Sequence, residues 1–268
     1  MFLGVLLLLA SVIPAADGVP ISYSVQGKGD PALVFVHCWS CDRHLWDNQV
    51  SVFAKDHRVV TIDLPGHGES GKGRKNWSIG GFGEDVKRVV VKLGLKRVVL
   101  IGSSMGGPVA LEAARRMPDR VVAIVPVDTL LNVEERMPAA QVEAALQQMR
   151  ADYKGETTKF MTQYLFAPST PAAVKDRVLS QATSAPPEIA IPILGAAFAY
   201  DPIPALQEIR VPIRAINSDL NPTNLEGNRK HAPLFDVVIM KGVGHYPMLE
   251  DPARFNELLT VVLRDFAK

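Results

Sequence analysis

The sequence predicts an α/β fold in which a doubly wound, mostly parallel sheet carries helices on both faces. Short apolar runs rich in Val and Ile recur along the chain, as in strands that are buried on both faces. Helical patterns separate these runs, and the clearest, at 79–93 and 108–117, end at Gly94 and before Pro118. Such strand–helix alternation is typical of parallel sheets. The predicted strands are 32–37, 58–63, 97–102, 121–128, 213–217 and 235–240.

One long interval interrupts this alternation. Between residues 129 and 206 the sequence shows helical patterns punctuated by prolines, but no convincing strand. We therefore predict an α/β core formed by residues 17–128 and 207–268, with a helical cap inserted at 129–206. The alternative is a set of extra packing helices that have no role at the functional site.

The N-terminus has an unusual composition. Residues 2–16 carry no charge and suit the apolar part of a secretory signal, although the run is too short for a membrane-spanning helix. Residues 1–16 are thus a possible signal or anchor, and an exported location (periplasmic or secreted) is slightly favoured over a cytoplasmic one. Membrane contact is expected only through this segment, if it is not cleaved. Alternatively, residues 11–16 form the first strand, because Asp17-Gly18 is a hairpin signal.

The overall composition excludes several classes of protein. The 268 residues are 47% apolar and 21% charged, close to the average for soluble globular proteins, which excludes global disorder. The 29 basic and 28 acidic residues give a net charge of +1, which offers no electrostatic footprint for a nucleic acid. Two cysteines are too few for a four-thiolate zinc site. We expect neither a metal nor a cofactor.

A candidate nucleophile follows the strand predicted at 97–102. The sequence from Gly102 to Gly106 reads Gly-Ser-Ser-Met-Gly, and a helix is predicted directly after it. A G-x-S-x-G motif between a buried strand and a helix is the pattern of a nucleophile elbow, which holds the central serine at the apex of a tight turn. The motif therefore predicts Ser104 as the nucleophile. Ser103 is the competing serine, but it occupies the variable position.

A serine hydroxyl needs a base, and the base needs an orienting acid. In this architecture the chain order is serine, acid, histidine, which leaves His231 and His245 as candidate bases. His245 is preferred because it lies in a loop directly after the strand predicted at 235–240. The predicted acid is Asp219, which follows the strand 213–217, the expected neighbour of the strand that leads to His245. Asp128 is the rival, because it also ends a strand.

Three motifs together resemble the α/β-hydrolase superfamily. They are Gly-Ser-Ser-Met-Gly at 102–106, Asp-Leu-Pro-Gly-His-Gly-Glu-Ser at 63–70 and Gly-His-Tyr-Pro at 244–247. They are most similar to the branch with serine esterases, haloperoxidase-like esterases and carbon–carbon bond hydrolases. The resemblance implies that 63–70 is a structural turn and that the backbone N–H groups of Trp39 and Met105 form the oxyanion hole. Cys38 departs from the family pattern, which usually has glycine at this position.

Cys38 and Cys41 also form a C-x-x-C sequence. A redox motif would normally open a helix in a thioredoxin-like βαβ unit, which is absent here. A structural disulfide is a second possibility if the protein is exported, and it would clamp the loop that carries Trp39, one of the implied oxyanion donors. Two ordinary buried thiols are the third.

These residues predict a serine hydrolase that cleaves carboxylic esters through an acyl-enzyme intermediate, with Ser104, Asp219 and His245 as the catalytic triad. The near-zero net charge suits a small, uncharged and fairly apolar ester as the substrate. Met and aromatic residues of the predicted cap could line an acyl pocket, although such residues are more often core. They are Met137, Met149, Phe160, Met161, Tyr164, Phe166, Phe198 and Tyr200.

Three other functions remain open at this point. A carbon–carbon bond hydrolase of diketone-like substrates would use the same triad and would need polar or cationic groups in the cap. An aminopeptidase would need acidic residues for the substrate amine, for which Glu134 and Glu135 are candidates. A small-molecule receptor could keep the triad with negligible turnover. The cationic candidates in the cap are Arg136, Arg150, Lys159 and Arg177.

Overall fold

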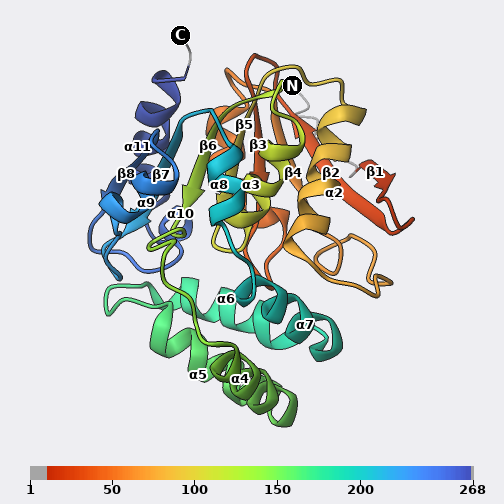
Figure 1. The fold of residues 1–268 in the computed structure, drawn as a ribbon, viewed down its shortest axis with the longest axis vertical. Coiled ribbons are helices and arrows are strands. Elements are labelled where there is room, and N and C mark those ends of the chain that lie inside the picture. Colours follow the sequence, from red (N-terminus) through yellow and green to blue (C-terminus); the bar gives the residue numbers. More distant parts are fainter. Residues whose placement is uncertain (1–10, 267–268) are drawn as a thin grey trace, which may run out of the picture.

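The computed structural model describes residues 11–266, and its centre is one eight-stranded sheet with the order β1-β2-β4-β3-β5-β6-β7-β8 (Figure 1). The pairs β1–β2 and β2–β4 are antiparallel, and all other neighbours are parallel. The predicted mostly parallel α/β sheet is therefore confirmed. The strands are β1 (Ser11–Pro14), β2 (Pro20–Gln26), β3 (Ala32–Val36), β4 (Val59–Ile62), β5 (Val98–Ser103), β6 (Val121–Val127), β7 (Ile213–Ser218) and β8 (Phe235–Met240).

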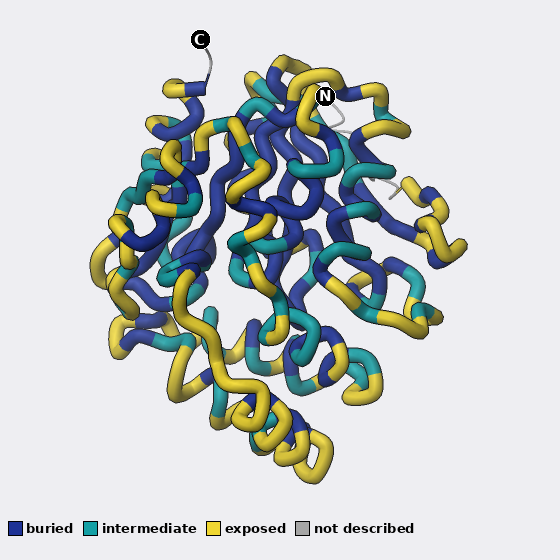
Figure 2. Tube along the Cα trace, in the orientation of Figure 1, coloured by how far each residue is buried: buried dark blue, intermediate teal, exposed yellow. Residues whose placement is uncertain are grey.

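Each face of the sheet has its own apolar core, which explains why the strands are apolar without alternation. In β3, Val34 packs into one core and Phe35 into the other. Phe35 lies 5.0 Å from the Trp46 ring, centroid to centroid. Figure 2 shows the central strands buried along their length. The flanking helices are η1 (Arg43–Trp46), α1 (Asp47–Phe53), α2 (Ile79–Lys92), α3 (Gly106–Arg116), α8 (Ile203–Glu208), α9 (Leu225–His231), α10 (Pro247–Glu250) and α11 (Pro252–Arg264).

Four of the five helices between β6 and β7 form a separate layer, here called the α4–α7 layer. It consists of α4 (Ala139–Ala151), α5 (Tyr153–Tyr164), α6 (Ala172–Ser184) and α7 (Pro187–Phe198). Figure 1 shows this layer beyond one end of the sheet, apart from the helices that cover the two faces. Hydrogen bonds join it to the loop after β3, since Trp39 Nε1 donates to the Ala190 carbonyl at 2.8 Å and Gln181 Nε2 to Asp42 Oδ2 at 2.8 Å.

The N-terminal segment contributes an edge strand. β1 pairs with β2 in the register Ser11 to Tyr23, and Gly18 adopts a φ of +83° in the connecting turn, a conformation that favours glycine. The interpretation of residues 11–16 as a first strand thus holds for Ser11–Pro14, while residues 1–10 of the possible leader lie outside the described residues. Among residues 11–266, no helix has both the length and the apolar character needed to cross a membrane.

Candidate active site

Ser104 lies in a sharp turn between β5 and α3. Its φ is +51°, a left-handed conformation that is rare for residues other than glycine. A Cβ on Gly102 would collide with the Gly106 carbonyl, and a Cβ on Gly106 would collide with the backbone of Val36. The two glycines of the motif therefore allow the close backbone approach that the turn requires. Ser104 lines a cavity, whereas Ser103 is completely buried and its hydroxyl has no hydrogen-bond partner within residues 11–266.

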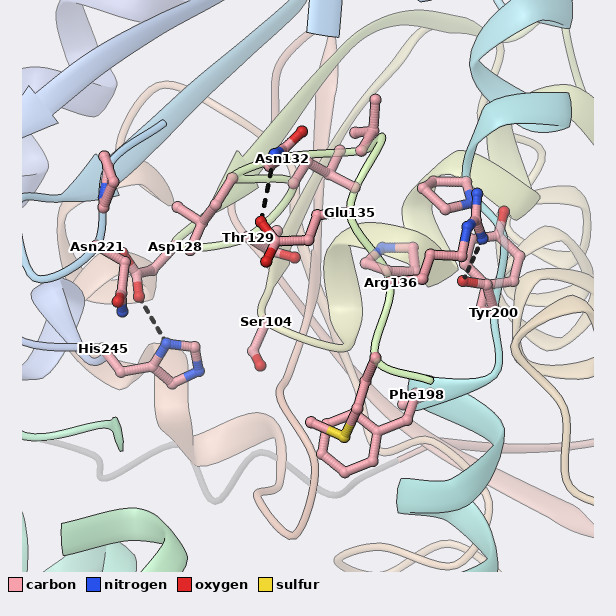
Figure 3. Close-up of a pocket in the computed structure, with 18 residues that line it drawn as sticks. Ser104, Asp128, Thr129, Asn132, Glu135, Arg136, Phe198, Tyr200, Asn221 and His245 are labelled. Carbon is pink, nitrogen blue, oxygen red and sulfur yellow. Dashed lines mark hydrogen bonds and ion pairs between the residues drawn. The ribbon is translucent and has the colours of Figure 1, made fainter. Parts of the chain in front are cut away.

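His245 is held in the loop between β8 and α10. Its backbone N–H donates to the Leu165 carbonyl at 2.9 Å, so the end of α5 helps to position it. Its Nδ1 lies 2.6 Å from Asp128 Oδ2. Figure 3 shows the other ring nitrogen on the side that faces Ser104. No hydrogen bond joins the Ser104 hydroxyl to this imidazole in the described part of the chain, and such pairs are often looser before a substrate binds.

Asp128 directly follows β6 and is buried beside His245. It has a φ of +47°, and its second oxygen, Oδ1, accepts from the Ser218 backbone N–H at 2.7 Å. Burial alone would raise the pKa of this carboxyl, but the hydrogen bonds from His245 and Ser218 outweigh it and hold the pKa below its usual range. The side chain is therefore an ionised acceptor at neutral pH, and it selects the His245 tautomer that carries the proton on Nδ1.

The prediction that Asp219 is the partner of His245 is wrong. Asp219 is exposed, and its Oδ1 accepts from the Gly242 backbone N–H at 2.7 Å, so it braces the loop after β8. The physical reason lies in the sheet order. The neighbouring strands have the order β5-β6-β7-β8. The loop that carries His245 leaves β8 and must pass the end of β7 to reach the cavity at Ser104, which follows β5. The strand between β7 and β5 is β6. The residue that ends β6 then lies closest to the imidazole.

Trp39 and Met105, whose backbone N–H groups are the predicted oxyanion donors, line a cavity together with Ser104. Within residues 11–266, neither N–H donates to another protein group. Trp39 is fixed by its indole bond to α7, and the carbonyl of the preceding Cys38 lies 2.7 Å from Nδ1 of His37. His37 Nε2 accepts from the Leu64 N–H at 3.0 Å, so His37 must be neutral with its proton on Nδ1. This arrangement leaves both predicted oxyanion donors available.

Cys38 and Cys41 form a disulfide that encloses Trp39 and Ser40. Both half-cystines are buried, and Ser40 adopts a φ of +53°. The bond agrees with the interpretation of the C-x-x-C sequence as a disulfide and contradicts the interpretation as two free thiols. It closes a short loop around one predicted oxyanion donor.

We expect the unreduced, denatured protein to contain no titratable thiol and the reduced protein to contain two, as measured with a thiol reagent and by intact mass. Reduction should lower the rate of the predicted ester cleavage, because the Trp39 N–H loses part of its positioning. The loss should remain below the ~10²-fold that follows removal of an oxyanion donor. The Cys38→Ser/Cys41→Ser variant should show the same loss and no further response to reductant. Two free thiols in freshly isolated protein would contradict the disulfide.

Two buried histidines, His37 and His67, make the stability of the fold depend on pH. The rings of His37 and His67 are 4.8 Å apart, centroid to centroid. Burial, reinforced by the neighbouring His37, lowers the pKa of His67 to about 3, and burial also lowers the pKa of His37. Both are neutral when the protein is folded but gain protons below the ordinary value of about 6.5 when it is unfolded. The unfolded state therefore binds more protons as the pH falls from about 6.5 towards 3, and acid destabilises the fold.

We expect the free energy of unfolding to fall by at least ~1.4 kcal/mol per pH unit below pH 6, the contribution of one such histidine. Replacing His67 with Gln should reduce this slope by about that amount, whatever it does to stability at neutral pH. Urea denaturation at a series of pH values measures the slope. The matched control is His44→Gln, whose side chain is 56% exposed and which should keep the wild-type slope. An unchanged slope in His67→Gln would overturn this explanation.

Two cavities meet at Ser104 and His245. The smaller, of about 290 Å³, extends from Trp39 and Met105 and is otherwise lined mainly by apolar side chains. The larger, of about 550 Å³, has polar groups on its walls, among them Glu135 and Arg136. Figure 3 shows Ser104 and His245 on one side of the larger cavity and Arg136, Tyr200 and Phe198 on the other. Thr129 lines both cavities but is not among the residues predicted from the sequence, although its place directly after Asp128 is a signal for it.

The remaining candidates have structural contacts. Asp63 accepts from the backbone N–H groups of Arg43 and Glu69 at 2.7 and 3.0 Å and pairs with the Arg43 guanidinium, as expected of a structural turn. His231 Nε2 lies 3.2 Å from Glu134 Oε1, away from Ser104. Among the described residues, no group of three or more His, Cys, Asp or Glu side chains is arranged to hold a metal ion.

The known proteins to which this chain is similar include esterases. Residues 33–258 match the Alpha/beta hydrolase family. A pimeloyl-[acyl-carrier protein] methyl ester esterase from Nitrosospira multiformis is 26% identical over 255 residues, which cover 88% of this chain and 95% of that protein. A thermophilic esterase from Thermogutta terrifontis has a TM-score of 0.84 and 25% identity, and the match covers 97% of this chain and 100% of that one. An acetyltransferase component of an acetoin cleaving system from Pseudomonas putida is 34% identical over 102 residues, which span 38% of this chain and 28% of that relative.

Proposed function

Since the chain belongs to the alpha/beta hydrolase family, we propose that it is a serine hydrolase that cleaves carboxylic esters through an acyl-enzyme intermediate on Ser104. The observation that carries this proposal is the pairing of His245 Nδ1 with the buried Asp128 carboxylate at 2.6 Å, beside a cavity that also contains Ser104. The proposed triad is thus Ser104, His245 and Asp128.

The proposed reaction has two halves. His245 Nε2 takes the proton from the Ser104 hydroxyl as its oxygen attacks the ester carbonyl, and Asp128 stabilises the imidazolium. The oxyanion accepts from the Trp39 and Met105 N–H groups. Collapse breaks the bond to the alcohol, which leaves with the proton from His245. His245 then takes a proton from water, whose oxygen attacks the acyl-enzyme, and the acid is released as Ser104 regains its proton.

The cavities suggest how the substrate is held. We assign the acyl group to the smaller, apolar cavity, because this cavity adjoins the proposed oxyanion donors. We assign the alcohol to the larger cavity, because its lining includes the polar side chains of Asn132, Glu135 and Arg136, which suit a leaving group that is released to water. Arg136, the cation of that cavity, pairs with Asp201 and donates to the Tyr200 carbonyl. Its charge is therefore compensated, which favours an uncharged ester.

Contacts of the α4–α7 layer and its flanks favour ester cleavage over the alternative functions. The four cations that could hold the acidic end of a diketone-like substrate all have partners within the protein. Three of them form ion pairs, which are Arg136 with Asp201, Arg150 with Glu143 and Lys159 with Glu156. The fourth, Arg177, donates a hydrogen bond to the His44 carbonyl. Of the two glutamates considered for binding a substrate amine, Glu134 contacts Lys230 and His231, and Glu135 accepts from Asn132 at 3.3 Å.

Covalent labelling tests the proposal directly. We expect wild-type protein to hydrolyse p-nitrophenyl butyrate with a burst equal to the enzyme concentration, and a fluorophosphonate probe to stop turnover by modifying one residue. Peptide mass spectrometry should place the label on Ser104. A label elsewhere, or full turnover after complete labelling of Ser104, would overturn the mechanism. Thermal stabilisation by an ester without any turnover would favour the receptor alternative.

A further inference from the structure

Phe198, the last residue of α7, lines three separate cavities. Two of them are the cavities that meet at Ser104. The third, of about 400 Å³, lies within the α4–α7 layer, where Leu146 and Met149 contribute from α4 and Phe160 and Gln163 from α5. This third cavity does not include Ser104 or His245, so neither the proposed acyl site nor the proposed alcohol site accounts for it.

Two aromatic rings separate the third cavity from the smaller catalytic cavity. Phe160 and Phe198 line both. Their centroids are 6.2 Å apart and their planes are nearly perpendicular, at 82°. Such an edge-to-face pair holds its rings in place more strongly than isolated side chains would. Phe160 and Phe198 thus form the wall at which the apolar cavity ends.

We propose that this wall sets the length of the acyl chain and that the third cavity is a blocked extension of the acyl site. The inference rests on the proposed ester hydrolysis and adds the substrate class: esters of short acyl chains, with an acyl site that lengthens when one ring is removed. Phe160 and Phe198 are specificity-determining residues, because they end the acyl cavity without reaching the reacting atoms.

The character of the third cavity supports a role for an apolar chain. Most of its lining residues are aliphatic or aromatic, and the polar ones are Gln148, Glu156, Lys159 and Gln163. Two of the lining residues, Met137 and Tyr164, are 45% and 55% exposed. An acyl chain that passed the wall would therefore enter a mainly apolar cavity that opens to the surface beside α4 and α5. Burial of each further methylene contributes about a fourfold gain in affinity or kcat/KM. Opening the wall should thus favour long chains over short ones.

The test compares p-nitrophenyl butyrate with p-nitrophenyl decanoate. We expect wild type to prefer butyrate, and both Phe198→Ala and Phe160→Ala to raise the decanoate-to-butyrate ratio of kcat/KM by about tenfold or more. A bulky residue placed in the third cavity, Ala145→Trp, should leave the wild-type ratio unchanged but abolish the gain in the Phe198→Ala background. If the chain instead enters the larger cavity, Ala145→Trp will not abolish the gain.

Two controls separate the wall from other effects. Val142→Ala removes a buried side chain of α4 that lines none of the three cavities, so it tests simple loosening of the layer and should leave the ratio unchanged. Calorimetric binding of decanoate to Ser104→Ala, with and without Phe198→Ala, needs no turnover. Tighter binding only in the double variant supports the wall even if ester hydrolysis fails. An unchanged ratio in both Phe variants, or a wild-type preference for decanoate, overturns the inference.

Discussion

Replacement of Ser104 by alanine should lower kcat for p-nitrophenyl butyrate by about 10⁶-fold and leave KM nearly unchanged. The reason is that the Trp39 and Met105 N–H groups and both cavities remain, so that substrate still binds while the attacking oxygen is lost. Any residual rate would come from water in the intact oxyanion site. Steady-state assays of purified protein measure kcat and KM. Loss of fluorophosphonate labelling in the same sample shows that the nucleophilic oxygen is what has been lost.

The conformation of Ser104 provides the control for this experiment. Its φ of +51° is strained for serine and equally strained for alanine, whereas glycine adopts it freely. Ser104→Gly should therefore lose the same activity and gain about 1 kcal/mol in the free energy of unfolding. Activity of Ser104→Ala above about a hundredth of wild type would exclude Ser104 as the nucleophile. A free energy of unfolding of Ser104→Gly at or above that of wild type would show that the loss of activity does not come from unfolding.

The sequence predicts the sheet well because local information determines it. The strands from β3 to β8 are runs of apolar side chains that need both faces covered, and the predicted boundaries agree with the structure to within about a residue. The elbow at Ser104 is equally local, since Gly102 and Gly106 are needed within five residues of one another. The edge strand β1 was harder to predict, because an apolar run such as Ser11–Pro14 fits both a strand and part of a leader.

The acid of the site could not be assigned from local sequence alone. Asp128 and Asp219 each follow a buried strand, and their flanking residues do not distinguish them. The choice depends on the path of the His245 loop, which the Leu165 carbonyl at the end of α5 helps to fix across the sheet. That contact joins residues 80 positions apart in the chain. The three cavities around Phe198 depend likewise on segments that are distant in the sequence.

Replacement of Asp128 by asparagine should lower kcat by about 10⁴-fold. The Ser218 N–H donates to Oδ1, so the side-chain carbonyl of the asparagine must stay on that side, and its NH₂ group must face His245 Nδ1. A donor in that position forces the imidazole proton onto Nε2. The nitrogen that faces Ser104 then cannot accept the serine proton, although every side chain keeps its shape.

The matched control is Asp219→Asn, which keeps an oxygen for the Gly242 N–H and should retain kcat within about twofold of wild type, because Asp219 is exposed and braces only a loop. Steady-state kinetics and thermal melts of both variants decide between the two acids. Because its hydrogen bonds keep the pKa of Asp128 low, the wild-type carboxylate is charged throughout the neutral range, and the difference between the variants should persist from pH 6 to pH 9. A severe loss in Asp219→Asn with an active Asp128→Asn would reverse the assignment. It would mean that the His245 loop moves to β7 during turnover.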